Sequence, residues 1–289
     1  MGWRQGVEQL LSKTMNEEIA VLNDRYIGGG SINDTRMVET TAGNFFVKVN
    51  SASRYPGMFE KEAKGLELLR AAGEISVPEV VGFGEDGHDA FLVLKYIESA
   101  GKKAGFWQDF GRRMAALHRH TDELFGLDHD NYIGSLPQSN TRHHTWEEFF
   151  MTERLEPQIR MAFDAGRIDS AMIRMFDRFF SKLDDIFPQE PPALLHGDLW
   201  GGNFMVNEKG EAVIIDPAVY YGHREMDLGM SQLFGGFDNS FYNAYNDHYP
   251  LENWWQERLD YCNLYPLMVH VNLFGGGYAG SVRSILKRF

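Results

Sequence analysis

The sequence predicts an α+β protein with two lobes, an N-terminal lobe built on a small antiparallel sheet and a mostly helical C-terminal lobe. Three observations support this prediction. The chain has 289 residues, enough for two lobes that each bury a core. Strand-like apolar runs separated by glycine-containing turns occupy much of the first part of the chain. Helical periodicity dominates most of the remainder. We expect the lobes at residues 1–94 and 98–289, joined by a hinge at 95–97.

Composition and charge narrow the classes of partner. The net charge is −13, so we expect neither nucleic acid nor an anionic membrane surface as a partner. The sequence holds one cysteine, Cys262, which rules out an intrachain disulfide and gives no sign of a secreted framework. No apolar run approaches the roughly 18 residues that a membrane-spanning helix needs. These features predict a cytoplasmic protein, with a monomer as the default oligomeric state.

A glycine-rich segment near the N-terminus is the first candidate binding element. It follows a loose helical pattern over residues 3–22 and lies between two strand-like runs. The candidate phosphate-binding residues in it are Gly28, Gly29, Gly30 and Ser31. Glycines have no Cβ, so a hairpin of this kind allows the backbone to approach phosphate groups closely. The alternative is a simple flexible turn, which a triple glycine also favours.

Lys48 and a following helix add to this candidate nucleotide site. Residues 45–49 form a predicted strand in which Lys48 alternates out of an apolar run. A lysine on the third strand, about twenty residues after a glycine-rich hairpin, is the arrangement that pairs with ATP phosphates; the alternative is a solvated strand residue. Residues 56–73 read as a helix whose apolar stripe is bordered by Glu62. We expect Glu62 to pair with Lys48, with Glu60 as the second choice.

Two further strands complete the predicted sheet and lead into the hinge. They cover residues 80–84 and 90–94, around a polar turn. The hinge residues that follow are Lys95, Tyr96 and Ile97. Backbone groups at this point are expected to hydrogen-bond the edge of an adenine, which requires no particular side chain, and ATP is expected to lie between the lobes.

The helical part of the chain begins soon after the hinge. A helix is predicted over residues 106–120, with His118 and His120 interpreted as surface or capping residues. A longer helical region, interrupted by Gly166, runs from residue 146 to about residue 187. A proline-rich linker then returns the chain to a short apolar run at 193–195, which is typical of a strand.

The segment after this strand carries the most specific pattern in the sequence. It places an acid, Asp198, then an amide, Asn203, five residues later, and a second acid, Asp216, thirteen residues beyond that. This is the spacing of a kinase catalytic loop. Asp198 would accept the proton of the attacking hydroxyl, and Asn203 and Asp216 would supply the oxygen ligands that Mg²⁺ prefers. The alternative is two unrelated turns.

The residues around this pattern favour a small-molecule kinase that is always active. Only ten residues separate Asp216 from Asp227, too few for a regulated activation loop. Gly197 precedes Asp198. At this position, regulated protein kinases carry an arginine that binds the phosphorylated activation loop. Because Pro217 disfavours the helical region for its neighbour, we expect Asp216 to be extended and held in place.

With these residues in view, the chain resembles the fructosamine/ketosamine kinase family, within the aminoglycoside-phosphotransferase-like branch of the protein-kinase-like fold. The similarity extends from about residue 20 to the C-terminus. The segments that carry it are 45–50, 58–62, 194–200 with Asn203, 216–218, 221–223, 233–237, and His270 with Asn272, Phe274 and Gly275. The tryptophan after His-Gly-Asp-Leu and the Phe-Gly-Gly-Phe run are the most specific of these signals.

The resemblance implies a role for each matching residue. Asp198 would be the proton acceptor, Asn203 and Asp216 the metal ligands, and Lys48 with Glu62 the pair that orients ATP. Asp227 would be a buried acid that anchors the catalytic loop. Ser31 stands where some relatives carry a cysteine, so redox control through the glycine-rich loop is not expected. ATP and Mg²⁺ are the expected cofactors.

The expected reaction is transfer of a phosphoryl group to O3 of a ketosamine, a fructosamine or ribulosamine that is free or protein-bound. The candidate acceptor-binding residues are Trp200, Tyr220, His223, His270 and Asn272. Their aromatic faces and hydrogen-bonding groups suit a sugar, although His270 and Asn272 could equally cross-link helices. Residues 261–289 contain no Asp or Glu, which speaks against a polycationic acceptor. The alternatives are an aminoglycoside or other small-alcohol phosphotransferase and a catalytically inactive nucleotide-binding regulator.

Overall fold

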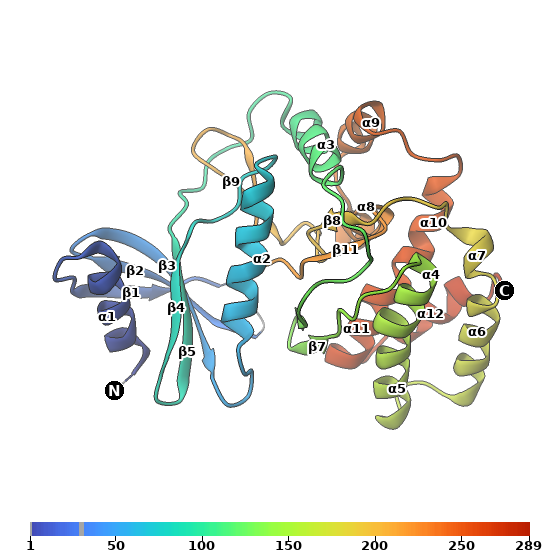
Figure 1. Cartoon of the computed structure of the whole chain (residues 1–289), viewed down its shortest axis with the longest axis horizontal. Coiled ribbons are helices and arrows are strands. Elements are labelled where there is room, and N and C mark those ends of the chain that lie inside the picture. The colour runs from blue at the N-terminus through green and yellow to red at the C-terminus, as the bar shows by residue number, and fades with distance from the viewer. Residues whose placement is uncertain (1, 29–31) are drawn as a thin grey trace. The chain divides into compact units, whose positions relative to one another are not determined.

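A computed structural model describes residues 2–28 and 32–289, and the chain divides into two compact units (Figure 1). The first comprises Met1–Phe106 and Gly202–Pro217, and the second comprises Trp107–Gly201 and Ala218–Phe289.

The strands are β1 Val21–Tyr26, β2 Asp34–Thr40, β3 Gly43–Ser51, β4 Val80–Asp86, β5 Asp89–Lys95, β6 Asn131–Ile133, β7 Leu136–Gln138, β8 Ala193–Leu195, β9 Phe204–Val206, β10 Ala212–Ile214 and β11 Tyr220–Gly222. The helices are α1 Trp3–Met15, α2 Met58–Ala72, α3 Phe106–Leu117, α4 Trp146–Phe149, a π-helix at Phe150–Leu155, α5 Glu156–Asp164, α6 Ser170–Phe180, α7 Leu183–Ile186, α8 Glu225–Gln232, a 3₁₀ turn at Leu233–Gly235, α9 Asn239–His248, α10 Trp255–Cys262, α11 Leu264–Phe274 and α12 Tyr278–Leu286.

The first unit is built on a five-stranded antiparallel sheet in the order β1-β2-β3-β5-β4, within the described residues. Side chains alternate between its two faces. On β5, Phe91 and Val93 pack into the cluster that includes Val7 and Leu11 of α1. Ala90, Leu92 and Leu94 of the same strand pack against Phe59, Ala63 and Leu66 of α2. The sheet is therefore covered by α1 on one face and by α2 on the other (Figure 1). The predicted antiparallel sheet of the N-terminal lobe is confirmed.

The N-terminal segment differs in one respect from the sequence pattern. The helical pattern over residues 3–22 is helix only as far as Met15. Asn16 follows in the left-handed conformation, with φ of 55°, and its N–H closes the helix onto the Ser12 carbonyl. Asparagine tolerates this conformation better than most residues, so it ends helices readily. Ile19 and Val21 pack in the core that α1 shares with the sheet. The apolar pattern in the sequence therefore continues beyond the end of the helix.

The second unit is mostly helical, with short strand pairs that support loops. Strand β8 pairs with β11, and β6 pairs with β7. The helices from α4 to α12 supply most of its buried apolar side chains, including Phe149, Phe176, Phe179 and Leu264. No helix in the part of the chain that the structure describes is long and apolar enough to cross a membrane. Together, the antiparallel sheet and this helical unit confirm the predicted fold class.

Candidate active site

A buried lysine at the centre of the first unit holds two carboxylates. Lys48 is 2% exposed on β3, and its Nζ lies 2.6 Å from Glu62 Oε1 and 2.7 Å from Asp216 Oδ1. Burial alone would lower the pKa of Lys48, but the charges of Asp216 and Glu62 outweigh it and raise the pKa above its usual value. The ammonium of Lys48 therefore stays charged.

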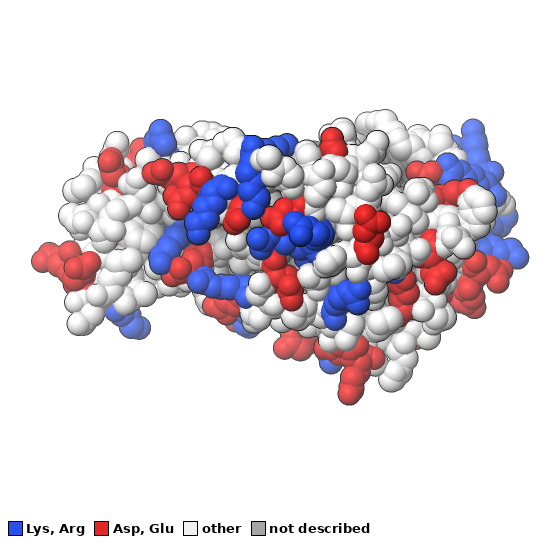
Figure 2. Space-filling view, turned by 90° about the horizontal axis from the view of Figure 1, so that it is seen from above, with Lys and Arg blue, Asp and Glu red and all other residues white. Residues whose placement is uncertain are grey.

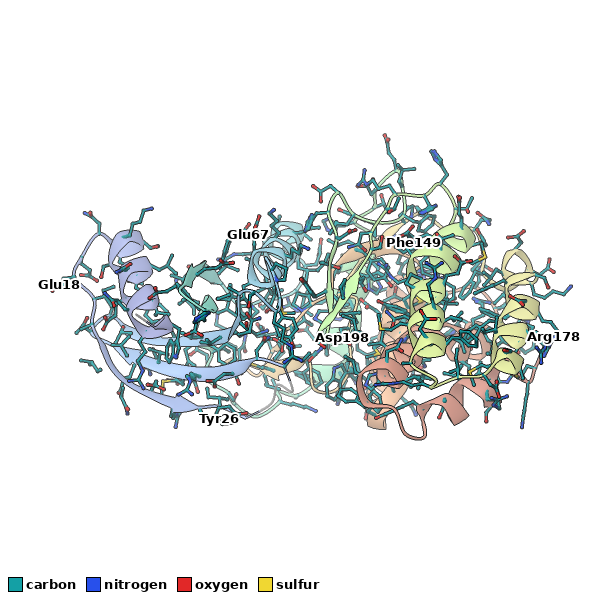
Figure 3. The ribbon with its side chains drawn as sticks, turned by 90° about the horizontal axis from the view of Figure 1, so that it is seen from below. Glu18, Tyr26, Glu67, Phe149, Arg178 and Asp198 are labelled. Atoms are coloured by element: carbon teal, nitrogen blue, oxygen red, sulfur yellow. The ribbon has the colours of Figure 1, made fainter. Side chains whose placement is uncertain are left out.

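The partner predicted for Lys48 is the one present in the structure. Glu62 lies on the side of α2 that faces β3, and its carboxylate contacts Lys48. Glu60, the second choice, is exposed and pairs instead with Lys64 one turn along the helix, at 2.7 Å. Glu67 is also exposed on α2 (Figure 3). The helical spacing of Glu62 relative to the apolar stripe was sufficient to select it.

The Lys48–Glu62 pair leads to a first testable result. In a double-mutant cycle with Lys48→Met and Glu62→Gln, the effects on kcat/KM should be non-additive, with a coupling of about 0.5–3 kcal/mol. Glu60→Gln is the matched control on the same helix and should combine additively with Lys48→Met, since Glu60 contacts Lys64. Coupling of Lys48 to Glu60 rather than Glu62 would contradict the assignment.

The two predicted metal ligands flank one β-hairpin of the first unit. Asn203 directly precedes β9 and Asp216 follows β10, and the Ile215 N–H donates to the Asn203 carbonyl at 3.0 Å. The hairpin is tied to the rest of this unit by the Ile214 N–H, which donates to the Ser76 carbonyl at 3.0 Å. Backbone pairing therefore brings two residues thirteen positions apart to the same end of one hairpin.

The donor set at this hairpin fits Mg²⁺. A carboxylate and an amide oxygen are hard ligands, and Mg²⁺ in kinases takes one or two protein oxygens together with phosphate and water. The described residues contain no cluster of three or more His, Cys, Asp or Glu side chains that could enclose a metal alone. The side chain of Asp216 is 44% exposed, so the carboxylate that holds Lys48 is also open to a cation.

The backbone of Asp216 differs from the prediction. The preceding-proline rule predicted an extended residue, but Asp216 has φ of 55°, in the left-handed region. The prediction is wrong because the rule describes only a local steric bias. Aspartate tolerates the left-handed region better than bulkier residues, and the hydrogen bond from Lys48 holds its side chain.

The remaining predicted nucleotide-binding residues are only partly described. Gly28 is exposed just after β1, whereas Gly29, Gly30 and Ser31 lie outside the described residues. Among the hinge residues, Lys95 ends β5, its N–H donates to the Glu79 carbonyl at 2.9 Å and its Nζ lies 2.9 Å from Glu79 Oε2. Tyr96 and Ile97 follow as half-buried coil. Their role in adenine binding stays a prediction.

The loop that carries Asp198 belongs to the second unit and depends on a glycine. Gly197 has φ of 83°, and a Cβ at this position would lie 2.0 Å from the Ala218 carbonyl oxygen. Any other residue would therefore both strain the backbone and collide with it. The Asp198 N–H donates to Nδ1 of the buried His196 at 3.2 Å. Gly197 is thus a structural requirement of the turn that presents Asp198, and His196 stabilises that turn.

Asp227 anchors the loop that carries Asp198, as the resemblance implied. Its carboxylate is 1% exposed and accepts the N–H of His196 at 2.8 Å and that of Gly197 at 2.9 Å. Burial alone would raise the pKa of Asp227, but His118 and these N–H groups hold the pKa below its usual value. The loop before Asp198 is therefore held by a permanently charged, fully buried acceptor.

His118 was interpreted as a surface or capping residue, and that interpretation is wrong. It is fully buried just after α3, with Nε2 3.2 Å from Asp227 Oδ2 and Nδ1 2.7 Å from the Tyr245 hydroxyl. A histidine at a helix end is usually predicted to be exposed, because the sequence does not show which distant residues pack against that helix end. Here the partner that requires its burial is more than one hundred residues away.

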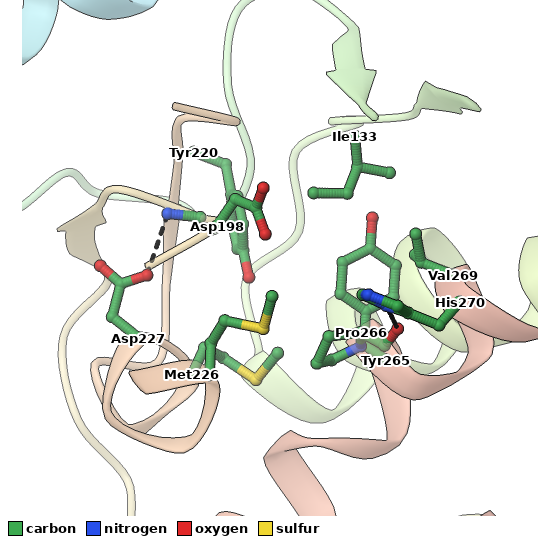
Figure 4. A pocket seen from close by; sticks show the side chains of 11 residues that line it. Ile133, Asp198, Tyr220, Met226, Asp227, Tyr265, Pro266, Val269 and His270 are labelled. Atoms are coloured by element: carbon green, nitrogen blue, oxygen red, sulfur yellow. Dashed lines mark hydrogen bonds between the residues drawn. The ribbon is translucent and has the colours of Figure 1, made fainter. Parts of the chain in front are cut away.

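A pocket in the second unit opens beside Asp198 (Figure 4). It is lined by Ile133, Gly197, Asp198, Tyr220, Met226, Asp227, Met230, Tyr265, Pro266, Val269 and His270. The Asp198 carboxylate points into the space bounded by the Tyr220, Tyr265 and Met226 side chains. Its cavity volume for a water-sized group is about 20 Å³, room for one hydroxyl-sized group. The arrangement suits the presentation of a single hydroxyl to a carboxylate base.

The structure brings some predicted acceptor-binding residues together and separates others. Tyr220 and His270 line the pocket with Asp198, and Trp200 contacts the ring of Phe234, which also contacts His270. His223 and Asn272 do not line it. His223 is fully buried against Trp146 and Phe187, and Asn272 donates to the carbonyl and side chain of Gln158. This is the helix cross-linking alternative for Asn272.

Sequence reasoning missed Arg154, which lies behind the pocket. It is fully buried in the π-helix, donates to the Ser139 carbonyl at 2.5 Å and to the Asn140 side chain at 2.6 Å, and stacks 3.9 Å from the Tyr220 ring centroid. Arginine is rarely buried completely. The π-helix, a rare element frequent at functional sites, is the structural sign of this position and has no sequence signature.

The chain is similar to known proteins over most of its length. The sequence profile of the fructosamine kinase family matches residues 3–289. A candidate ketoamine kinase of Enterococcus faecium is 39% identical over 263 residues, 90% of this chain and 93% of its own. A chloroplastic protein-ribulosamine 3-kinase of Arabidopsis thaliana is 40% identical over 268 residues, 91% of this chain and 81% of its own.

Solved structures extend the comparison. A candidate fructosamine-3-kinase from Thermobifida fusca has a TM-score of 0.86 at 34% identity, over 97% of both chains. The aminoglycoside phosphotransferase APH(4)-Ia has a TM-score of 0.66 at 14% identity, over 98% of both chains, and shows the shared fold alone. The fold is therefore of the protein-kinase-like type, and a kinase of this type uses a nucleotide as phosphoryl donor.

Proposed function

The chain belongs to the fructosamine kinase family, and we propose that it transfers the γ-phosphoryl group of ATP to O3 of a ketosamine, a fructosamine or ribulosamine. Catalysis of phosphoryl transfer consists mainly of positioning and charge neutralisation. The two units divide this work. The first supplies Lys48, Glu62, Asn203 and Asp216 toward the nucleotide, and the second supplies Asp198 and the acceptor pocket.

Each residue has a defined task in this reaction. Lys48, oriented by Glu62, would bind the phosphates of ATP with its permanently charged ammonium. Asp198 would accept the proton of the acceptor hydroxyl as its oxygen bonds to the γ-phosphorus and the bond to ADP breaks. Asn203 and Asp216 would hold Mg²⁺, which neutralises charge on the phosphates. Asp227 keeps the Asp198 turn in shape through its two backbone hydrogen bonds.

The observation that supports a sugar acceptor is the lining of the pocket. Apart from Asp198, its only carboxylate is Asp227, which is buried and already accepts two N–H groups. The other lining groups are aromatic, apolar or imidazole side chains, which suit a hydroxyl-bearing edge of a sugar. A polycationic aminoglycoside would need several free carboxylates, and the pocket together with the acid-free segment 261–289 offers none beyond the base.

The wider setting follows from composition and fold. Along the chain we propose lobes at 1–94 and 98–289, joined by an adenine-binding hinge at 95–97, with the segment Gly202–Pro217 returning to the first unit. Acidic and basic side chains are interspersed on the face shown in Figure 2, and the net charge of −13 supports a small-molecule or protein-bound ketosamine rather than nucleic acid as the partner. The single cysteine is consistent with a cytoplasmic protein, and a monomer suffices for the reaction.

An acceptor panel tests the proposal. Fructoselysine, ribuloselysine and kanamycin are each incubated with ATP and Mg²⁺, and the product is identified by mass. We expect kcat/KM for the ketosamines to exceed that for kanamycin by about 10²-fold or more, since a site without spare carboxylates leaves the ammonium groups unpaired. Phosphorylation of kanamycin with the ketosamines untouched would make the protein an aminoglycoside kinase. ATP binding without turnover of any acceptor would make it an inactive regulator.

A further inference from the structure

Phe234 is an exposed aromatic residue that the fold holds in an unfavourable conformation. It lies in the Phe-Gly-Gly-Phe run after α8, with φ of 58° and ψ of 37°, in the left-handed region. This region is unfavourable for a bulky residue. The side chain is nevertheless 48% exposed, so burial of the ring gives little in return. Strain of this kind that packing does not require points to a role in binding.

The rings around Phe234 connect it to the catalytic loop and to the pocket. Its ring centroid lies 5.9 Å from that of Trp200, edge to face, and Trp200 is two residues beyond Asp198. Its ring centroid also lies 4.9 Å from that of His270, which lines the pocket with Asp198. The ring centroid of Tyr278 lies 6.4 Å from that of Phe234 and 5.0 Å from that of His270. We call Trp200, Phe234, His270 and Tyr278 the aromatic cluster.

His270 contributes no positive charge to this cluster. Its Nδ1 lies 2.7 Å from the Pro266 carbonyl oxygen, which can only accept, so Nδ1 carries a proton. Burial lowers the pKa of His270 below its usual value, with the Pro266 carbonyl acting in the opposite direction. The ring is therefore neutral near pH 7, and its Nε2 is an acceptor. A cation beside the cluster meets aromatic faces and a lone pair.

We propose that the aromatic cluster binds the protonated amine of the ketosamine, with Phe234 as the residue that makes the enzyme specific for an amine-bearing sugar. This inference rests on the proposed function, because it assigns a part of the same acceptor. A ketosamine differs from a plain ketose by the secondary amine at C1, which is a cation near neutral pH. Aromatic faces attract such cations through their quadrupole.

The chemistry of the surrounding chain favours an aromatic rather than a carboxylate receptor for this amine. Residues 261–289, which carry His270 and Tyr278, contain no Asp or Glu. Two or three aromatic faces are enough to bind the single ammonium of one ketosamine through cation–π attraction. The exposure of Phe234 also leaves room for the carrier of the amine, whether a free lysine or a lysine of a protein.

The test compares a charged and a neutral acceptor of the same shape. Fructoselysine carries the ammonium, and the matched 1-O-alkyl ether of fructose replaces the nitrogen with oxygen. Three variants are measured: Phe234→Leu, which keeps apolar bulk but removes the ring, Phe234→Tyr, which keeps the ring, and Phe163→Leu, a control at a similarly exposed phenylalanine of α5 outside the cluster. Thermal unfolding of each variant checks the fold.

We expect Phe234→Leu to lower kcat/KM for fructoselysine by about 5- to 30-fold, the range of a cation–π contact that the bound substrate shields from water. The kcat/KM of the ether, or its inhibition constant if it is not turned over, should change less than about twofold, since no cation is lost. Phe163→Leu should remain near wild type, and Phe234→Tyr, which keeps the aromatic face, should lose less kcat/KM for fructoselysine than Phe234→Leu.

Two results would overturn the inference while the proposed function stands: equal losses for the two acceptors in Phe234→Leu, or an unchanged kcat/KM for fructoselysine. Failure of the wild-type protein to phosphorylate any ketosamine would instead refute the proposed function, and this inference with it.

Discussion

Replacement of Asp198 with Asn is expected to lower kcat by about 10²- to 10⁴-fold while ATP binding is retained. Asn has the shape of Asp but cannot accept the proton of the acceptor hydroxyl. The turn should survive, because Gly197 and the hydrogen bonds of Asp227 hold its backbone independently of the Asp198 side chain. Steady-state kinetics with a ketosamine, together with calorimetric titration of ATP, separate the chemical step from binding.

The control for this variant is Asp169→Asn. Asp169 caps α6 and pairs with Arg283 on the surface, and Asn is an equally good N-cap, so kcat should be unchanged. Turnover of Asp198→Asn close to wild type, in a preparation free of wild-type enzyme, would remove Asp198 from the role of proton acceptor.

Asp216→Ala should reduce activity by about 10³-fold or more, the second large effect. The substitution removes a charged metal ligand and at the same time one of the two carboxylates that hold Lys48. Asn203→Ala removes a neutral ligand and leaves the Lys48 ion pairs intact, so its loss should be smaller. Activity measured as a function of Mg²⁺ concentration should show a raised Mg²⁺ requirement for Asn203→Ala.

Full activity of Asp216→Ala, or activity of the wild type without any divalent ion, would contradict the metal assignment. Loss of the fold is the competing explanation for an inactive variant. Thermal unfolding distinguishes the two, and Asp216→Asn, which keeps the side-chain shape, repeats the measurement with less disturbance of the pocket around Lys48.

The parts of this account that depend on short-range periodicity could be predicted from the sequence. Glu62 was selected over Glu60 because its position relative to the apolar stripe of α2 fixes the side of the helix on which it lies. The strands around Lys48 and the hairpin that joins Asn203 to Asp216 follow the same local rules.

The parts that depend on distant contacts could not be predicted in this way. The burial of His118 is decided by Asp227, that of Arg154 by rings from other elements, and the left-handed backbone of Phe234 by no pattern in its neighbours. Similarly, His223 and Asn272 looked like sugar-binding groups by residue type, whereas the helices around them turn both into interior side chains. The residue type alone does not reveal whether a side chain points into the interior or toward the pocket.

The central claim is phosphorylation of a ketosamine on O3, and the position of the phosphate in the product tests it most directly. Fructoselysine is converted with ATP and Mg²⁺, and the product is examined by phosphorus–proton correlation NMR. The account predicts coupling of the phosphorus to the proton on C3, with loss of the signal in Asp198→Asn. A phosphate on another hydroxyl, or no phosphorylated fructoselysine at all, would contradict it.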